Sequence, residues 1–511
     1  MPDPRVASGT PVVRTKRPNK PTLFLLALAG SVWLPLSAEG QLGPDGSPIN
    51  TSNYTVDLTR GVVISTSRVV GLSGAATSLA QGVEGGLQNP AAVAYRGPQW
   101  PDWYDYWLAF GMTFPFQSGD FYNSGRVVGD TGAVSDNTFF LIPGAYFQMW
   151  NLGIGLTIDS QFIKLGGVVN PVTMQEETLR LRFTTFHIQA GYGFFDGQLI
   201  LGGGLRILRQ RTFQSREVIS DGDVYQALGL GAEVGVMIRP HHQRWSLGAS
   251  LFPPISTGVQ TKGSIAPNPD GDIVVGDFYL PRATKIPTTG SVGFSYQFGP
   301  RPTNPPWVSA ETLAADELER LKRRKHVAEE AEREEIAAVR ARGGPDVDVC
   351  VQAVEQRYAR KYAKIKQSRK EMKKMAWDML RKQYRWGWPR RYYLITADLW
   401  FNGRVTNGVG LESLLFQTVQ RSGEKITVSP RVGFESEVVP TRMKIRAGTY
   451  LEPSRFAQST ARVHGTLGFD ISVLKWSVFG IWPEDYRWQI SAALDVSRKY
   501  TSFSFGIGGW Y

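Results

Sequence analysis

Residues 103–114 read "WYDYWLAFGMTF", and large apolar side chains occupy every second position of this stretch. The even positions from Tyr104 to Phe114 are aromatic or aliphatic, whereas the odd positions include Asp105 and Gly111. A period of two is the pattern of a β-strand with one apolar face and one polar or small face. The stretch therefore predicts a strand that separates an apolar from a polar environment.

The same alternation recurs along the chain, at residues 228–238, 443–451 and 467–473 among others. Between its large apolar side chains lie glycines and these charged residues: Glu233, Arg431, Glu435, Arg442, Lys444, Arg446 and Asp470. A soluble β-sandwich, the alternative fold, would bury the apolar faces and expose these charges. A transmembrane β-barrel turns the apolar face to lipid and the polar face to its lumen. We therefore expect an all-β fold, an antiparallel transmembrane barrel.

The alternating runs number about fourteen, eight within residues 103–299 and six within 391–511. An even count places both ends of the barrel on the periplasmic side, where connections are short. The Asp196-Gly197 pair follows the fourth strand and suits a tight turn on that side. The last strand, "TSFSFGIGGWY", predicts an aromatic face that serves as a membrane-insertion signal, formed by Phe503, Phe505, Ile507 and Tyr511.

Residues 1–40 have the pattern of a secretory signal peptide. Basic residues precede an apolar run at 23–36, and small residues follow it. A membrane anchor is the alternative, but the run is short and Pro35 interrupts it. With the barrel pattern, the signal predicts the bacterial outer membrane as the location.

Residues 300–390 interrupt the alternation with helix-forming, highly charged sequence. Two helices are predicted, over 310–342 and about 346–385, forming a hairpin. The second carries a seven-residue repeat that predicts a packing seam: Val351, Tyr358, Ile365, Met372 and Met379. Strand parity places this insert in the periplasm. The formal charge of the chain is +12, of which residues 301–391 carry +9, so the insert either docks an acidic partner or is simply a solvated hairpin.

Three stretches resemble the FadL-type long-chain fatty-acid transporters and their PorV-like relatives. They are "GAATSLAQGVEGGLQNPAAVA" at 74–94, "IPTTGSVGFSYQF" at 286–298 and "RVGFESEVVPTRMKIRAGTYLEPSRF" at 431–456. The resemblance implies that residues 41–102 hold an N-terminal segment and lumenal plug, with residues 54–100 as the plug itself. It further implies these plug residues: Gly71, Gly74, Asn89, Pro90 and Ala91. In that family an apolar ligand passes through the barrel, whereas the helical insert has no counterpart there.

The charged lumenal residues are the candidate ligand site. They are Glu233, Arg431, Glu435, Arg442 and Arg446. One interpretation is a salt-bridged interior that stiffens the wall. The other is that the arginines bind a ligand carboxylate, which a guanidinium holds through two hydrogen bonds.

No motif indicates an enzyme, and we expect no catalytic site, cofactor, metal site or nucleic-acid partner. The glycine run at 229–235 lies inside a predicted strand, and His241-His242 lies in a turn without a third ligand. The leading hypothesis is passive uptake of a hydrophobic or amphipathic, fatty-acid-like compound by a barrel embedded in outer-membrane lipid. The alternative is a scaffold that docks a periplasmic protein through the helical insert, and a lipid-modifying barrel enzyme ranks third.

Overall fold

The structure is a computed structural model that describes residues 42–98, 100–116, 120–125, 138–169, 176–214, 223–260, 267–275, 278–480, 482 and 486–510. The signal peptide predicted at residues 1–40 and the predicted insertion residue Tyr511 lie outside the described residues.

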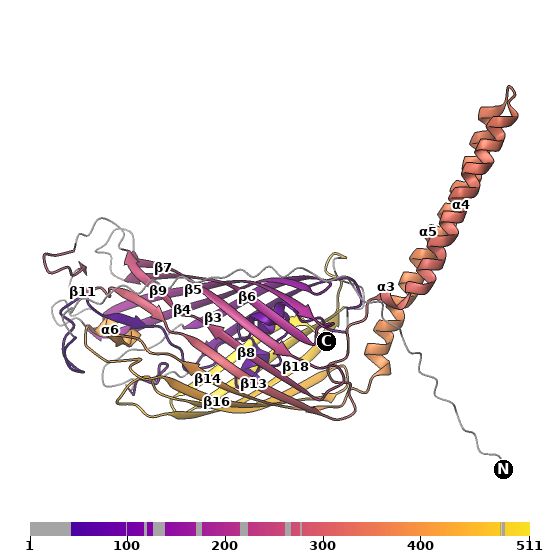
Figure 1. The fold of residues 1–511 in the computed structure, drawn as a ribbon. Helices are drawn as coiled ribbons and strands as arrows, with labels where there is room; N and C mark the ends of the chain where they lie inside the picture. The colour runs from indigo at the N-terminus through magenta and orange to yellow at the C-terminus, as the bar shows by residue number, and fades with distance from the viewer. Residues whose placement is uncertain are drawn as a thin grey trace, which may run out of the picture. The chain divides into compact units, whose positions relative to one another are not determined.

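In the described part of the chain, fourteen antiparallel strands close into a barrel (Figure 1). They are β2 (Tyr104–Pro115), β3 (Phe139–Met149), β4 (Leu152–Val169), β5 (Glu176–Phe194), β6 (Leu199–Gln214), β7 (Asp223–Ile238), β8 (Trp245–Phe252), β13 (Thr289–Phe298), β14 (Tyr393–Asn402), β16 (Thr427–Val439), β17 (Met443–Glu452), β18 (Arg462–Lys475), β19 (Arg487–Ser497) and β20 (Tyr500–Gly509). The first and last strands pair, with Phe110 opposite Ile507, so the wall has no free edge.

The wall turns its apolar face outward, which confirms the predicted transmembrane barrel. On β7, Leu228 and Leu230 are 60% and 69% exposed, whereas Glu233 is 1% exposed. On β20, Phe503 and Ile507 lie on the outer face and their serine and glycine neighbours face inward. An outer apolar surface of this kind is stable only in lipid.

The two ends of the barrel differ in the length of their connections. At the end where β2 begins, residues 150–151 and 195–198 form short turns. At the opposite end, residues 116–138 connect β2 to β3 and residues 253–288 connect β8 to β13. Short turns mark the periplasmic side of outer-membrane barrels and long loops the extracellular side. We call these the turn end and the loop end.

Several short elements lie at the loop end, one in the segment before β2 and the others in connections between barrel strands. The three-residue strand β1 pairs in parallel with both β12 and β15. The elements are β1 (Thr55–Asp57), β9 (Ile255–Gln260), β10 (Val274–Val275), β11 (Phe278–Tyr279), β12 (Ala283–Ile286), β15 (Gly408–Val409) and α6 (Leu411–Phe416).

The segment that precedes β2 contains three single-turn helices: α1 (Ser67–Gly71), α2 (Gly82–Gly86) and η1 (Pro90–Ala94). Nearly every residue from 65 to 94 is buried. We call residues 54–98 the plug, because they pack inside the barrel.

The helical insert between β13 and β14 comprises α3 (Ala310–Leu313), α4 (Ala315–Arg342), α5 (Val347–Lys382) and the π-helical turn η2 (Gln383–Gly387). The helices α4 and α5 pack side by side (Figure 1). No helix in the described ranges is both long and apolar enough to cross a membrane.

The side chains of the predicted α5 seam are buried or half-buried except at the end of the seam, where the last one is exposed. Val351 and Tyr358 are buried, Ile365 and Met372 are half-buried, but Met379 is 54% exposed. The prediction for Met379 is wrong because a straight helix drifts by about 20° per seven residues. A different side chain, Ala376, is buried at that level instead.

Candidate functional site

The plug spans the lumen from one wall to the opposite one. Helix α1 contacts β17, β18, β19 and β20, whereas η1 contacts β4, β5, β6 and β7. The predicted plug residues Gly71, Gly74, Pro90 and Ala91 are buried between these walls, and Asn89 is 0% exposed.

Glycines in the wall make room for the plug backbone. A Cβ atom at Gly202 would lie 2.5 Å from Cα of Ala91, and one at Gly235 would lie 2.0 Å from Oδ1 of Asn89. On the opposite wall, a Cβ atom at Gly468 would lie 3.0 Å from Cα of Gly71. Side chains at Gly202 and Gly235 would thus push the plug away from the wall, and at the opposite wall Gly71 and Gly468 meet with glycine on both sides of the contact.

The Asn89 side chain satisfies four backbone groups around the η1 turn. Its amide nitrogen donates to the carbonyl oxygens of Thr77 and Val236, each at 3.0 Å, and more weakly to that of Ala249 at 3.4 Å. Its Oδ1 accepts the Ala91 N–H at 3.0 Å and so caps the turn. This residue links two parts of the plug to the wall.

An ion-pair network joins the plug to β16, β17 and β18. Arg446 Nε lies 2.6 Å from Glu435 Oε2, and Arg446 Nη1 lies 2.6 Å from Asp470 Oδ1. From the plug, Arg68 Nε lies 3.3 Å from the same Glu435 oxygen, and the Tyr392 hydroxyl donates to Glu435 Oε1 at 2.7 Å. Glu435 and Arg446 therefore follow the salt-bridged interpretation of the lumenal charges.

The other predicted lumenal residues have different environments. Glu233 is buried, with Oε2 at 2.8 Å from His187 Nδ1. Arg442 is exposed and lies in the turn before β17, so its placement in the lumen was wrong. The alternating pattern was extended one position beyond the end of the strand, where side chains no longer alternate about the wall.

A cavity of about 160 Å³ lies between the plug and the wall. Plug residues on its surface include Val62, Val63 and Ile64, and wall residues include Phe183, Leu208, Phe252 and Trp400. Its polar lining includes Arg60, Asp159, His187, Arg206 and Arg431. An apolar cavity of about 150 Å³ in another protein holds one benzene molecule. This cavity therefore has room for a ligand of about one ring.

Two buried guanidinium groups reach this cavity. Arg431 lies 4.6 Å above the Trp400 ring, and its Nε is 3.3 Å from Ser429 Oγ. Arg206 lies 5.3 Å above the Phe252 ring and donates to the backbone carbonyls of Ala232 and Pro253. Among the described residues, neither has a carboxylate within ion-pair distance, whereas Arg60 in the same lining is paired with Asp159 at 2.7 Å.

A second cavity, of about 90 Å³, lies on the other side of the plug. Plug residues Arg68, Gln81 and Tyr95 line it together with Arg239 of the turn end. Arg239 stacks 4.0 Å from the Tyr95 ring and donates through Nε to Asn304, while its buried Nη1 has no hydrogen-bond partner among the residues that the structure describes. The plug thus separates a cavity near the loop end from a basic cavity near the turn end.

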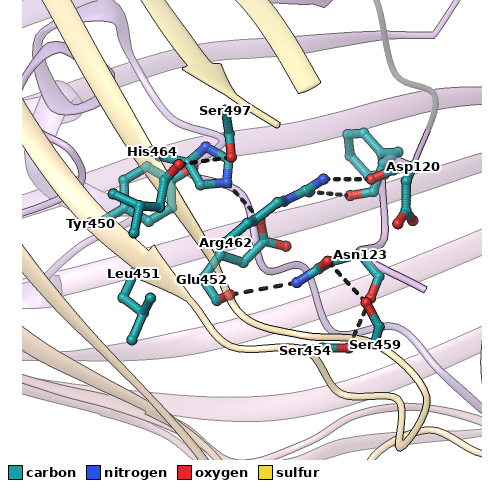
Figure 2. Close-up of polar contacts among 12 residues, drawn as sticks. Asp120, Asn123, Tyr450, Leu451, Glu452, Ser454, Ser459, Arg462, His464 and Ser497 are labelled. Carbon is teal, nitrogen blue, oxygen red and sulfur yellow. Dashed lines mark hydrogen bonds and ion pairs between the residues drawn. The ribbon is translucent and has the colours of Figure 1, made fainter. Parts of the chain in front are cut away.

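A third polar cluster closes the loop end, and sequence reasoning missed it. Figure 2 shows Glu452 between Arg462 and His464, whose nitrogens lie 2.5 and 2.7 Å from Glu452 Oε2. Arg462 also donates to the carbonyl oxygen of Asp120 at 2.7 Å, which holds the loop against the wall. Tyr450 connects the cluster to the plug, because its hydroxyl accepts the Val63 N–H at 3.3 Å.

The base of the helical insert contacts the chain where it leaves the plug. Trp377 Nε1 donates to the Asp102 carboxylate at 3.0 Å, and Trp307 Nε1 donates to the Trp100 carbonyl at 2.9 Å. Arg96 lies 4.3 Å above the Trp307 ring. Partial burial raises the pKa of Asp102, while the hydrogen bond from Trp377 opposes that rise.

The closed wall, its apolar outer face and its buried charged lumen require a lipid surround. The protein is a bacterial outer-membrane barrel with an internal plug. This is the fold that the FadL-type resemblance implied.

Comparison with solved structures finds likenesses of low sequence identity. The CymD monoaromatic hydrocarbon channel is 9% identical with a TM-score of 0.44, over 88% of this chain and 97% of that one. The toluene transporter TbuX of Ralstonia pickettii is 11% identical with a TM-score of 0.43, over 90% and 98%. A Pseudomonas aeruginosa FadL homologue is 12% identical with a TM-score of 0.42, over 91% and 99%. No protein-family model and no curated protein matches the chain. Likenesses this distant carry no argument about function.

Proposed function

We propose that the protein is a passive outer-membrane channel for small amphipathic compounds that combine an apolar ring with a carboxylate. The observation that carries this proposal is the cavity beside the plug, in which two buried guanidinium groups have no carboxylate within ion-pair distance among the described residues. A buried charge without a counter-ion in contact is costly, and a ligand carboxylate would relieve that cost.

The two halves of the cavity suit the two halves of such a ligand. Phe183, Leu208 and Phe252 offer an apolar surface to a ring, whereas Arg431 and Arg206 offer hydrogen-bond donors to a carboxylate. A pocket with a mainly apolar lining and a few convergent polar groups is the usual form of a small-molecule site. The volume of about 160 Å³ favours one ring over an extended long-chain fatty acid.

Passage to the turn end would require the plug to shift, because the plug lies between the two cavities. The plug packs against glycines of the wall, and the Arg68–Glu435 and Arg60–Asp159 ion pairs join it to wall strands. Small-residue contacts allow sliding without the loss of interlocked side chains. The basic cavity that follows is suited to receive the ligand carboxylate, because the Nη1 atom of Arg239 has no hydrogen-bond partner there in the described part of the chain.

Replacing Arg431 by methionine tests the carboxylate site. We expect Arg431→Met to weaken the binding of labelled benzoate to the purified protein about tenfold or more, since charge-assisted hydrogen bonds contribute about 1.5–3 kcal/mol. Binding of toluene, which has no carboxylate, should change little. The measurement is equilibrium dialysis at constant protein concentration.

The control for this experiment is Arg442→Met, the same chemical change at an exposed turn residue. It should bind both compounds like the unmodified protein. Equal loss of benzoate binding in the two variants, or no loss in either, would remove Arg431 from the site.

The scaffold function stays as a second candidate because the helical insert has unpaired apolar residues. Met375 and Met379 are 57% and 54% exposed and lie four residues apart, on one face of α5. Exposed apolar pairs of this kind suit a partner helix or groove. Trp377 and Trp307 contact residues 100–102, which follow the plug, and these contacts would connect such a partner to the barrel.

Shortening the insert separates the two candidates. Replacing residues 323–367 by a short Gly-Ser turn keeps the apolar base formed by Ala310, Ala314 and Ala376. If uptake is the function, the shortened protein should bind benzoate as tightly as the full chain, because no described residue of the helical insert lines the cavity. If scaffolding is the function, ligand binding should be absent from both proteins, and cross-linked partners in native membranes should be lost only from the shortened one.

A further inference from the structure

The outer face of the barrel carries a compact basic patch that ligand uptake does not use. It consists of Arg180 and Arg182 on β5 and Arg209 and Arg211 on β6. The first three are exposed and Arg211 is half-buried, and all four alternate with inward-facing residues. We call these four residues the arginine patch.

The register brings these like charges together. Arg182 lies directly opposite Arg211, and Arg209 lies opposite Thr184 on the neighbouring strand. Like charges in direct cross-strand pairs are unfavourable. A hollow of about 90 Å³ lies among them, lined by Arg182, Thr184, Phe186, Arg209 and Arg211. Within the described ranges, neither Arg182 nor Arg209 has a carboxylate within ion-pair distance. An anion in the hollow would offset the repulsion.

The position of the arginine patch along the wall shows which layer of the membrane lies next to it. On β6 the outward residues from Leu199 to Ile207 are apolar or glycine, and Arg209 follows. The ten residue-to-residue steps from Leu199 to Arg209, at about 3.4 Å each and a tilt of about 40°, rise about 26 Å along the barrel axis. The apolar band of outer-membrane barrels is about 25 Å tall. The patch therefore begins where lipid headgroups begin, on the loop side.

We propose that the arginine patch binds the phosphate groups of a glycolipid in the outer leaflet. Guanidinium groups match phosphate oxygens through paired hydrogen bonds. Arg182 is oriented by the Phe162 ring, which lies 4.9 Å from its guanidinium carbon. Below the patch, Leu205 is 59% exposed and offers an apolar surface to the acyl chains of the same lipid.

The test compares lipids that differ only in phosphate, by native mass spectrometry of the full-length protein in detergent. Bis-phosphorylated lipid A should bind at least tenfold more tightly than dephosphorylated lipid A. The double variant Arg182→Gln with Arg209→Gln should lose this preference. The control, Arg404→Gln with Arg498→Gln, removes two exposed arginines of the loop end outside the patch and should keep the preference.

Two results would overturn the proposal. One is equal binding of the two lipids by the unmodified protein, or an unchanged preference in the patch variant. The other is displacement of lipid A by millimolar inorganic phosphate, which would make the patch a site for free phosphate. Benzoate binding in the lumen serves as the folding control for the patch variant. If the unmodified protein does not bind benzoate, circular dichroism is the folding control instead.

Discussion

Replacing Gly202 by valine is expected to dislodge the plug and make the barrel leak. A Cβ atom at this position would lie 2.4 Å from the Ala91 nitrogen and 2.5 Å from the Pro90 carbonyl carbon. Both are backbone atoms, so no side-chain rotation relieves the clash. Because η1 is clamped by Asn89 to β7, the strain passes to the whole plug. Overpacking of this kind typically costs about 1–3 kcal/mol.

The leak is measured as ion conductance of single barrels in a planar lipid bilayer. The unmodified protein should be nearly closed, and Gly202→Val should show long-lived openings. Gly465→Val is the matched control, since a Cβ atom at Gly465 on β18 meets nothing within 4 Å. A Gly202→Val barrel as silent as the control would show that the plug does not depend on this contact.

Replacing Arg446 by methionine is expected to cause the largest loss of stability. Its side chain is 1% exposed and holds two carboxylates, those of Glu435 and Asp470. Removing one partner of a buried ion pair leaves uncompensated buried charge, which costs about 3–5 kcal/mol. The free energy of unfolding in urea, measured in lipid vesicles, should fall by that amount.

Two further variants make this prediction specific. Arg442→Met carries the same change four residues earlier at an exposed turn position, and should alter the free energy of unfolding by less than about 0.5 kcal/mol. Adding Glu435→Gln and Asp470→Asn to Arg446→Met should recover most of the loss, because the unpaired charges disappear. Equal destabilisation by Arg446→Met and Arg442→Met would contradict the network.

The fold could be predicted because the surrounding lipid requires every strand to turn apolar side chains outward and polar or small ones inward. Alternation within β7, β16 and β17 placed Glu233, Glu435 and Arg446 inside the wall correctly. The same rule failed at Arg442, because it applies only within a strand and the sequence does not mark where β17 begins. Alternation also did not predict which face of β6 carries Arg206, because the neighbouring Leu201, Leu205 and Leu208 occur on both faces of that strand.

The cavity could not be predicted from local pattern. Its lining brings together plug residues near position 63 with Phe183, Phe252 and Trp400, which are far apart in the chain. Which of them meet depends on how the plug is seated against the glycines of the wall. Likewise, whether Arg431 pairs with a carboxylate or faces a cavity is decided by the register of its neighbours, and alternation does not fix that register.

A crystal structure of the full-length barrel with 4-bromobenzoate tests the central claim most directly. Anomalous scattering locates the bromine without reference to the shape of the density. The account predicts a bromine peak in the cavity beside the plug, among Phe183, Leu208 and Phe252, with the carboxylate facing Arg431. An empty cavity at saturating ligand, or a bromine peak only on the outer wall, would contradict it.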